Sequence, residues 1–274
     1  MTDGWRLLRV HNLLLAAAGV VAGGWIALGA VALPKLLAFA AVSGAGLGAA
    51  GNVANDLHDA AADRVNRPAG ERPIAAGRVA RDTAHLLVWL GTLLGLGAAA
   101  LVSGWQLAVG IAALVVMLGY SPWLKRYGPP GNLAVAAVAG LPPFYGALAV
   151  GRPAAGLVPW VLAAWIHLAR EIVKDLQDEA GDRLVGRRTL PLRVGRVMAQ
   201  RIGWWICLGF VPLSVVLPLV AQYRPAYFAV LVPAQLLILL AAFRLRRERF
   251  DSASRWLKLG MAIGLVALVL GGRA

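Results

Sequence analysis

The chain has 274 residues, of which 59% are hydrophobic and 15% are charged, and its mean hydropathy is +0.70. A water-soluble domain cannot bury that much apolar surface, so the composition excludes that class and indicates a polytopic membrane protein. The net charge of +14 does not indicate a nucleic-acid partner, because no basic arm with interleaved stacking aromatics occurs.

Eight stretches without Asp, Glu, Lys or Arg follow one another along the chain. Most of them reach the ~20 residues that a helix needs to cross a hydrocarbon core. They cover residues 10–34, 36–55, 83–124, 127–151, 153–169, 202–223, 225–243 and 259–272. The third stretch is about twice as long as one crossing, and a turn signal at Ser103-Gly104 divides it. We therefore expect an all-α bundle of nine transmembrane helices in a single membrane-embedded domain, residues 1–274.

The last stretch is the shortest, which leaves eight spans as the alternative. Arg255 and Lys258 precede it, and their long side chains can reach the interface from inside a helix, so we expect this helix to begin earlier. In the fourth stretch, Pro142-Pro143 breaks the helix and can open space within the bundle. The aromatic residues near these span ends are expected either to wall that space or simply to pack the bundle: Tyr120, Trp123, Phe144 and Tyr145.

The positively charged residues are distributed unevenly between the two sides of these spans. The N-terminus and the second, fourth, sixth and eighth connections hold 23 of the 27 Lys and Arg residues, and all 13 acidic residues fall on the same side. Short loops rich in Lys and Arg stay in the cytoplasm. We therefore expect a multi-pass protein of the cell membrane whose polar residues face the cytoplasm.

One pattern of polar residues occurs twice, at the ends of the second and sixth predicted spans. The copies are Asn52, Asp56, Asp59 and Asp63, and Glu171, Asp175, Asp178 and Asp182, related by a shift of 119 residues. Offsets of 0, 4, 7 and 11 fall within roughly 60° of arc on an α-helix, so each copy faces one direction. A single copy is equally typical of a solvated helix end with salt bridges, but repetition at identical spacing favours a functional site.

Carboxylates at this density would repel one another without cations. Hard oxygen ligands suit Mg²⁺, which typically bridges protein carboxylates to substrate phosphates. The candidate metal ligands are therefore the six aspartates of the two copies: Asp56, Asp59, Asp63, Asp175, Asp178 and Asp182. Flanking Lys and Arg side chains would bind the phosphate oxygens that the metal leaves free, so we expect a diphosphate between the copies.

The motifs Asn55-Asp56-x-x-Asp59-x-x-x-Asp63 and Lys174-Asp175-x-x-Asp178-x-x-x-Asp182 resemble those of the UbiA-type intramembrane prenyltransferases. The similarity covers nearly the whole chain and includes the segments Arg72-Pro73-Ile74, Tyr120-Ser121-Pro122, Gly131-Asn132 and Arg170-Glu171. It implies a helical bundle around a cavity open to lipid, with a prenyl diphosphate bound through Mg²⁺. Ionisation of an allylic diphosphate leaves a carbocation, which a dry apolar tunnel protects from water.

The resemblance also implies roles for individual residues. We expect catalytic roles for Asp56, Asp59, Asp175, Asp178, Lys125 and Tyr120, of which Tyr120 can stabilise positive charge through its ring. The residues expected to bind the diphosphate are Asn12, Asn52, Asn55, Arg67, Arg72, Lys125, Arg126, Asn132, Arg170 and Lys174. The expected partners are the two substrates and membrane lipids, and no obligatory protein partner is indicated.

Within this family, the chain is most similar to the digeranylgeranylglyceryl phosphate synthases, through Asp63-Arg64-x-Asn66-Arg67-Pro68 and Arg170-Glu171-Ile172-Val173-Lys174-Asp175. Those enzymes transfer a geranylgeranyl chain to a glycerol-phosphate lipid ether. An inserted Ala69-Gly70 departs from their pattern, so prenylation of an aromatic quinone or tetrapyrrole precursor stays an alternative. A cation-coupled transporter is the alternative from another class, although transporters place their charged groups near the midplane.

Overall fold

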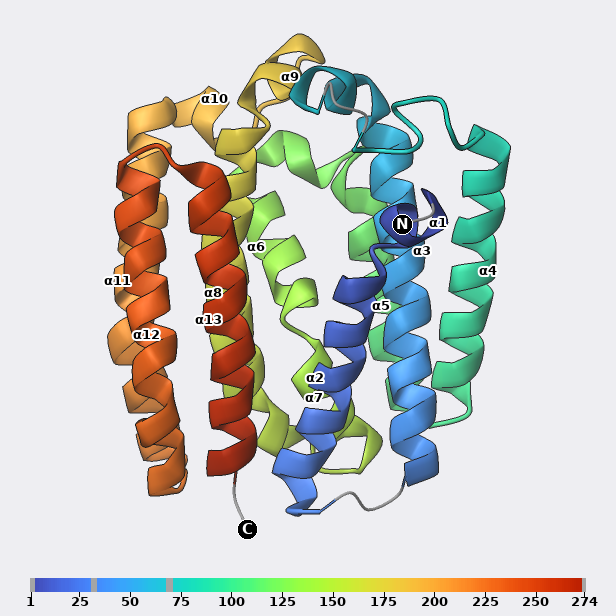
Figure 1. Cartoon of the computed structure of the whole chain (residues 1–274). Coiled ribbons are helices and arrows are strands. Elements are labelled where there is room, and N and C mark those ends of the chain that lie inside the picture. Colours follow the sequence, from blue (N-terminus) through green and yellow to red (C-terminus); the bar gives the residue numbers. More distant parts are fainter. Residues whose placement is uncertain (1–2, 31–33, 68–70, 273–274) are drawn as a thin grey trace.

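The computed structural model describes residues 3–30, 34–67 and 71–272, and every regular element in these ranges is a helix (Figure 1). The elements are α1 Asp3–Leu8, α2 Val10–Leu28, α3 Pro34–Asn66, α4 Arg81–Ala100, α5 Gly104–Tyr120, η1 Leu124–Tyr127, α6 Pro129–Ala139, α7 Pro142–Ala149, η2 Pro153–Gly156, α8 Leu157–Gln177, α9 Glu179–Leu184, α10 Leu190–Val194, α11 Arg196–Val220, α12 Pro225–Arg246 and α13 Phe250–Gly271. The prediction of an all-α fold is confirmed.

Seven helical segments of the described ranges are long and apolar enough to cross a membrane: α2, α3, α4, η2 with α8, α11, α12 and α13. The pair α6 and α7, bent by 45°, makes an eighth if it counts as one span, and α5 is an apolar helix of 17 residues. Large apolar side chains lie exposed on α4 and α11, among them Trp89, Leu93 and Leu219, as contact with lipid requires. The chain is a multi-pass membrane protein.

Three local predictions are confirmed. Ser103 caps α5 by accepting a hydrogen bond of 3.1 Å from the backbone N–H of Gln106, so two helices share the long charge-free stretch. Pro142 and Pro143 open α7, where the preceding helix breaks. The last helix begins at Phe250 and contains Lys258, so it starts well before the charge-free stretch.

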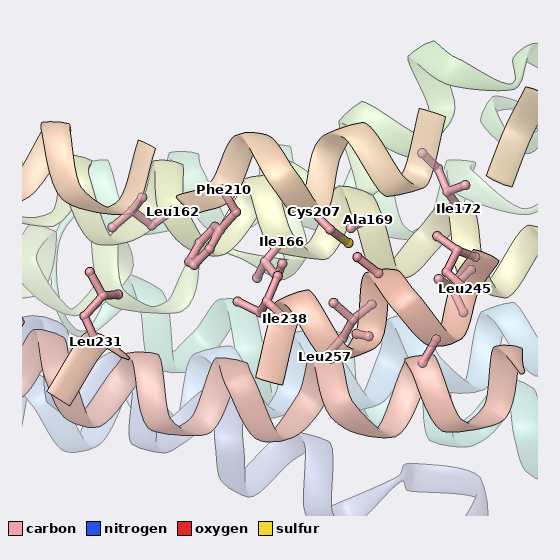
Figure 2. Close-up of a cluster of buried hydrophobic side chains, with 14 of the residues drawn as sticks. Leu162, Ile166, Ala169, Ile172, Cys207, Phe210, Leu231, Ile238, Leu245 and Leu257 are labelled. Atoms are coloured by element: carbon pink, nitrogen blue, oxygen red, sulfur yellow. The ribbon is translucent and has the colours of Figure 1, made fainter. Parts of the chain in front are cut away.

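Two of the four hydrophobic clusters in the described residues join several helices of the bundle. The larger one joins α8, α11, α12 and α13, and Figure 2 shows their side chains packed around the buried, free Cys207. The other joins α2, α3 and α7, whose backbones approach closely at glycines. A Cβ on Gly23 would lie 1.8 Å from the carbonyl oxygen of Pro143, and one on Gly146 would lie 1.8 Å from that of Val20.

α3 carries the first polar motif beyond the apolar region of the bundle. It has 33 residues and is therefore about 50 Å long, against a hydrocarbon core of about 30 Å. Its last turns extend to the end of the bundle where α9, α10 and residues 71–80 also lie, the upper end in Figure 1. This is called the site end below.

Candidate active site

The two acidic motifs meet at the site end. All four residues of the first motif lie on α3, as expected. The second motif is divided, because α8 ends at Gln177, Asp178 follows it and Asp182 belongs to α9. The expectation that the second motif occupies one continuous helical face is therefore wrong.

The short helix α9 is docked directly onto the end of α3. A Cβ on Gly181 would lie 2.4 Å from the carbonyl oxygen of Ala62, so only glycine permits this approach. Asn66 of α3 fastens the contact, since its side chain donates to the carbonyl oxygen of Asp178 at 3.1 Å and accepts from the N–H of Gly181 at 2.8 Å. This docking brings Asp182 within reach of cations that also bind α3.

Three cations each bind two carboxylates, one from the first motif and one from the second. Lys125 Nζ lies 3.7 Å from Asp59 and 3.2 Å from Asp182. Arg187 forms ion pairs with the same two aspartates. Arg67 lies 3.3 Å from Asp63 and 2.7 Å from Asp178. We call Arg67, Lys125 and Arg187 the bridging cations.

Two further arginines bind the first motif alone. Arg9 bonds to Asp56 and, at 3.3 Å, to Asn55. Its backbone has φ 54° and ψ 51°, a left-handed conformation that non-glycine residues seldom adopt and that turns the chain from α1 into α2. Arg72 lies 3.3 Å from Asp56 and 3.6 Å from Asp63.

Sequence reasoning missed Arg9 and Arg187 as site residues. Both were counted as charges that orient the protein in the membrane, since nothing in the local pattern separates them from the other cations of these loops. For Arg187 the available signal was its place in the basic segment that follows the second motif, whereas no local signal distinguishes Arg9.

Lys125 is charged although only 6% of its side chain is exposed. Burial is the largest effect and lowers the pKa of its ammonium group, but the negative charges of Asp59 and Asp182 outweigh burial and raise the pKa above its ordinary value. The pKa of the Arg187 guanidinium is raised by the same two carboxylates against the opposing effect of burial. Both cations are therefore available to a phosphate.

The asparagines predicted for the site are brought to the motifs or beside them. Asn132 donates to Asp175 at 2.8 Å, and Asn55 donates to Asp59 at 3.2 Å. Asn52 donates to the carbonyl oxygen of Leu8 at 3.2 Å, next to Arg9. These contacts orient the amide groups at the edge of the carboxylate cluster.

Arg126 is not brought to the site. Its guanidinium donates to the hydroxyl of Tyr127 at 3.1 Å and lies 5.1 Å from the centre of that ring. Adjacent residues of the short helix η1 point in different directions, so Lys125 is buried while Arg126 is exposed. Within the described ranges Arg126 forms no ion pair with either motif, and the expectation that it binds a diphosphate loses its structural basis.

A cavity of about 420 Å³ reaches from the motifs into the bundle. Its polar lining, at the site end, includes Arg9, Asn12, Asn52, Asn55, Tyr120, Arg170, Glu171 and Lys174. Its apolar lining includes Leu47, Ala113, Met117, Val135, Leu162 and Ile166, from four different helices. The cavity therefore joins a charged end to an apolar interior, which suits a molecule with a charged head and a hydrocarbon chain.

Of the four aromatic residues expected around this cavity, two line it and two do not. Tyr120 and Tyr145 line it, together with Pro142 and Pro143. Phe144, between Pro143 and Tyr145 on α7, does not line the cavity. Its ring packs against Trp160 instead, with ring centroids 5.3 Å apart. Trp123 is 62% exposed and does not line the cavity either.

A protein-family model matches residues 16–266, which is most of the chain, and it describes the UbiA prenyltransferase family. The chain belongs to the UbiA prenyltransferase family. The resemblance of the sequence to this family is thereby confirmed.

Relatives of this UbiA member include three proteins, each named digeranylgeranylglyceryl phosphate synthase. The one from Thermococcus gammatolerans is 38% identical, over 90% of this chain and 88% of that protein. The one from Halobacterium salinarum is 36% identical, over 97% and 95%. The one from Methanopyrus kandleri is 35% identical, over 96% of both.

Solved structures show that the fold is shared with other UbiA proteins. An apo UbiA homolog from Aeropyrum pernix K1 superposes with a TM-score of 0.79 at 20% identity, over 95% of this chain and 96% of that one. A UbiA homolog from Archaeoglobus fulgidus, bound to GPP and Mg²⁺, superposes with a TM-score of 0.70 at 19% identity, over 96% and 99%.

Counted as formal charges, the carboxylate cluster of this UbiA member is negative by one. Six aspartates of the two motifs face five cations, namely Arg9, Arg67, Arg72, Lys125 and Arg187. An anionic diphosphate would meet repulsion there unless further positive charge accompanied it. The site of this UbiA protein therefore calls for an added cation.

The donor set fits a hard divalent metal ion. Oδ2 of Asp56 and Oδ2 of Asp182 are buried without a hydrogen-bond partner in the structure, and such oxygens are available as ligands. In the described part of the chain no three His, Cys, Asp or Glu side chains lie close enough to hold a metal, because the arginine and lysine side chains lie between the aspartates. A metal would therefore have to displace part of this ion-pair network.

Proposed function

We propose that this chain is a magnesium-dependent prenyltransferase that transfers a geranylgeranyl group from its diphosphate to a hydroxyl group of a glycerol-phosphate lipid. The observation that carries the proposal is the joining of the two aspartate motifs by Arg67, Lys125 and Arg187 at the charged end of an apolar cavity. The shared name of relatives at 35–38% identity supports the choice of donor and acceptor.

In the proposed reaction, the bond between the allylic carbon and the diphosphate oxygen breaks, and the diphosphate leaves with the electron pair. The bridging cations would exchange their aspartate partners for the departing oxygens, as charge-assisted donors. The residues that would hold Mg²⁺ are Asp56, Asp59, Asp63, Asp175, Asp178 and Asp182, and the bound metal would supply the remaining neutralisation of the leaving group.

The cavity protects the prenyl cation that this ionisation leaves. Its apolar lining excludes water, which would otherwise form an alcohol. Tyr120 lines the cavity at its charged end, where the face of its ring can stabilise positive charge. The acceptor's hydroxyl oxygen then attacks the allylic carbon, a carbon–oxygen bond forms, and the hydroxyl proton is released.

We also propose how the chain lies in the cell membrane. The seven long spans, the bent pair α6–α7 and the shorter α5 together make nine crossings in one membrane-embedded domain. The site end then faces the cytoplasm, which is supported by the side that holds 23 of the 27 Lys and Arg residues. Membership of a prenyltransferase family removes the support for a transporter.

The decisive experiment incubates the purified protein with geranylgeranyl diphosphate and Mg²⁺ in separate reactions with different acceptors. One reaction holds geranylgeranylglyceryl phosphate, and the others hold aromatic quinone precursors. We expect the doubly prenylated glycerol phosphate as the product, identified by mass spectrometry, and no product in excess EDTA. A prenylated aromatic product would instead assign the chain to the other acceptor class.

A further inference from the structure

A second group of cations lines the cavity outside the carboxylate cluster. Arg170 and Lys174 lie on α8 and Lys258 lies on α13, and all three belong to the cavity lining. Within residues 3–30, 34–67 and 71–272 none of them forms an ion pair with an aspartate of the motifs. Their contacts therefore do not assign them to the diphosphate.

The protein neutralises these three cations only in part. Glu171, with 4% of its side chain exposed, lies 2.9 Å from Lys174 and 3.6 Å from Arg170. Lys258 forms no ion pair with a carboxylate of the described residues, although the positive charges of Arg170 and Lys174 act on it. Three cations against one carboxylate leave about two positive charges, which match the ~−2 charge of a phosphate monoester at neutral pH.

Arg9 also acts on Lys258, but it is already paired with Asp56. Arg72 acts on Lys258 as well and is likewise paired with Asp56. The cavity thus has two neighbouring charged regions, the carboxylate cluster with its formal negative charge and the three cations with their formal excess of positive charge. A metal-bound diphosphate suits the first region, and a metal-free phosphate suits the second.

The cavity continues from Lys258 along an apolar wall. Met261, Leu265 and Leu268 of α13 line it, and Leu13 and Leu15 of α2 line it from the neighbouring helix. α2 and α13 are in contact beside one another (Figure 1). Leu15 is 53% exposed although it also lines the cavity, so this wall reaches the lipid-facing surface between the two helices. A lipid chain can thus lie here while its head reaches Lys258.

We propose that Arg170, Lys174 and Lys258 form a second anion site, which binds the phosphate monoester of the acceptor lipid while its chain lies between α2 and α13. The site rests on the proposed function, and it explains how that function selects a glycerol-phosphate lipid over an aromatic acceptor. Its three cations bind the acceptor's phosphate from α8 and α13 and leave the hydroxyl free to approach the donor. Glu171 holds two of the cations in place.

The test compares two acceptors that differ only in the phosphate: geranylgeranylglyceryl phosphate and geranylgeranylglycerol. In Lys258→Gln, we expect KM for the phosphorylated acceptor to rise by about tenfold or more, because one charge-assisted contact is lost. The KM for geranylgeranyl diphosphate and the rate with the phosphate-free acceptor should not change, and Lys258→Arg should restore the lost affinity. Arg255→Gln is the matched control, since it removes the same charge from α13 at a position outside the cavity lining.

A binding measurement separates this inference from the proposed function. Labelled geranylgeranylglyceryl phosphate is added to the protein in EDTA without donor, and the retained label is measured for the unaltered protein and Lys258→Gln. Retention by the unaltered protein and a tenfold weaker Kd in the variant support the site, even if no transfer occurs. Equal retention by both overturns the site, even if transfer occurs, and so does a rise in KM for the diphosphate instead of the acceptor.

Discussion

Lys125 Nζ lies 3.2 Å from Asp182 Oδ1, and the Asp182 side chain has no exposed surface. Removing one partner of a buried ion pair leaves an uncompensated charge, which costs about 3–5 kcal/mol. Lys125 therefore has two tasks in this structure, since it stabilises the contact of α9 with α3 and also supplies a positive charge for a phosphate.

Replacing Lys125 by methionine should reveal both tasks. Without metal, Lys125→Met leaves Arg187 as the cation that still pairs with both Asp59 and Asp182, so one positive charge faces two buried carboxylates and we expect the Tm to fall by roughly 10 °C in EDTA. Mg²⁺ should recover part of that loss, since it can neutralise the same carboxylates. Thermal unfolding in detergent measures both values, with Lys35→Met, an exposed lysine at the start of α3, as the control. An equal loss with and without Mg²⁺ would contradict this role.

Asp56→Asn and Asp175→Asn should each abolish prenyl transfer, with a residual rate of about one thousandth or less, because each removes a carboxylate that the metal requires. Asp175 receives its hydrogen bond from Asn132, and an asparagine can keep that contact, so this variant should stay folded. Product formation and thermal unfolding are measured together. His58→Gln is the control, because His58 is exposed on α3 and bonds to the carbonyl oxygen of Ala54. Full activity in either aspartate variant would refute the mechanism.

Arg187→Gln and Arg126→Gln form a matched pair that tests where the structure places the two arginines. Arg187 joins Asp59 to Asp182, so its loss should raise KM for the diphosphate by about tenfold or more. Arg126 contacts Tyr127 at the surface, so its loss should change kcat/KM less than about twofold. Steady-state kinetics with varied donor distinguishes them, and a larger effect at Arg126 would reverse the assignment.

Gly181→Ala should reduce transfer by moving α9 rather than by removing a reacting group. A methyl group there would meet the carbonyl oxygen of Ala62 at 2.4 Å, which forces α9 away from α3. We expect the rate to fall by about tenfold or more, with kcat affected more than the donor KM, since Asp182 no longer faces Asp59. Gly97→Ala on α4 is the control, because an added Cβ meets nothing within 4 Å. Unchanged kinetics in Gly181→Ala would show that this contact does not position the site.

The sequence predicts those parts of the site that depend on helical periodicity. The first motif lies on one face of α3 because that helix continues without interruption to Asn66. Helical periodicity does not predict the arrangement of the second motif. The helix is interrupted at Asp178, where Gly181 docks against Ala62, a residue far away in the sequence. Contact between distant segments leaves no trace in local spacing.

The sequence predicts only some of the cations at the site, since Arg67, Arg72 and Lys125 were expected there but Arg9 and Arg187 were not. Arg126 and Lys125 are neighbours with similar chemistry, yet only the lysine is buried among the aspartates. Arg9 reaches Asp56 because its own backbone is left-handed. Glycine or asparagine would have predicted such a turn, but this position holds an arginine. Periodicity shows which helical face is charged, but the conformation of short connections decides which side chains reach it.

In this structure the aspartates of the motifs are the counter-ions of the bridging cations. In the proposed reaction, Arg67, Lys125 and Arg187 would leave their aspartate partners when a metal-bound diphosphate enters, and the aspartates would bind them again when pyrophosphate departs. In each catalytic cycle, aspartate carboxylates and substrate phosphate oxygens would alternate as partners of the same cations. The aspartates thereby compete with the product for the same cations, so the architecture that binds a highly charged leaving group also promotes its release.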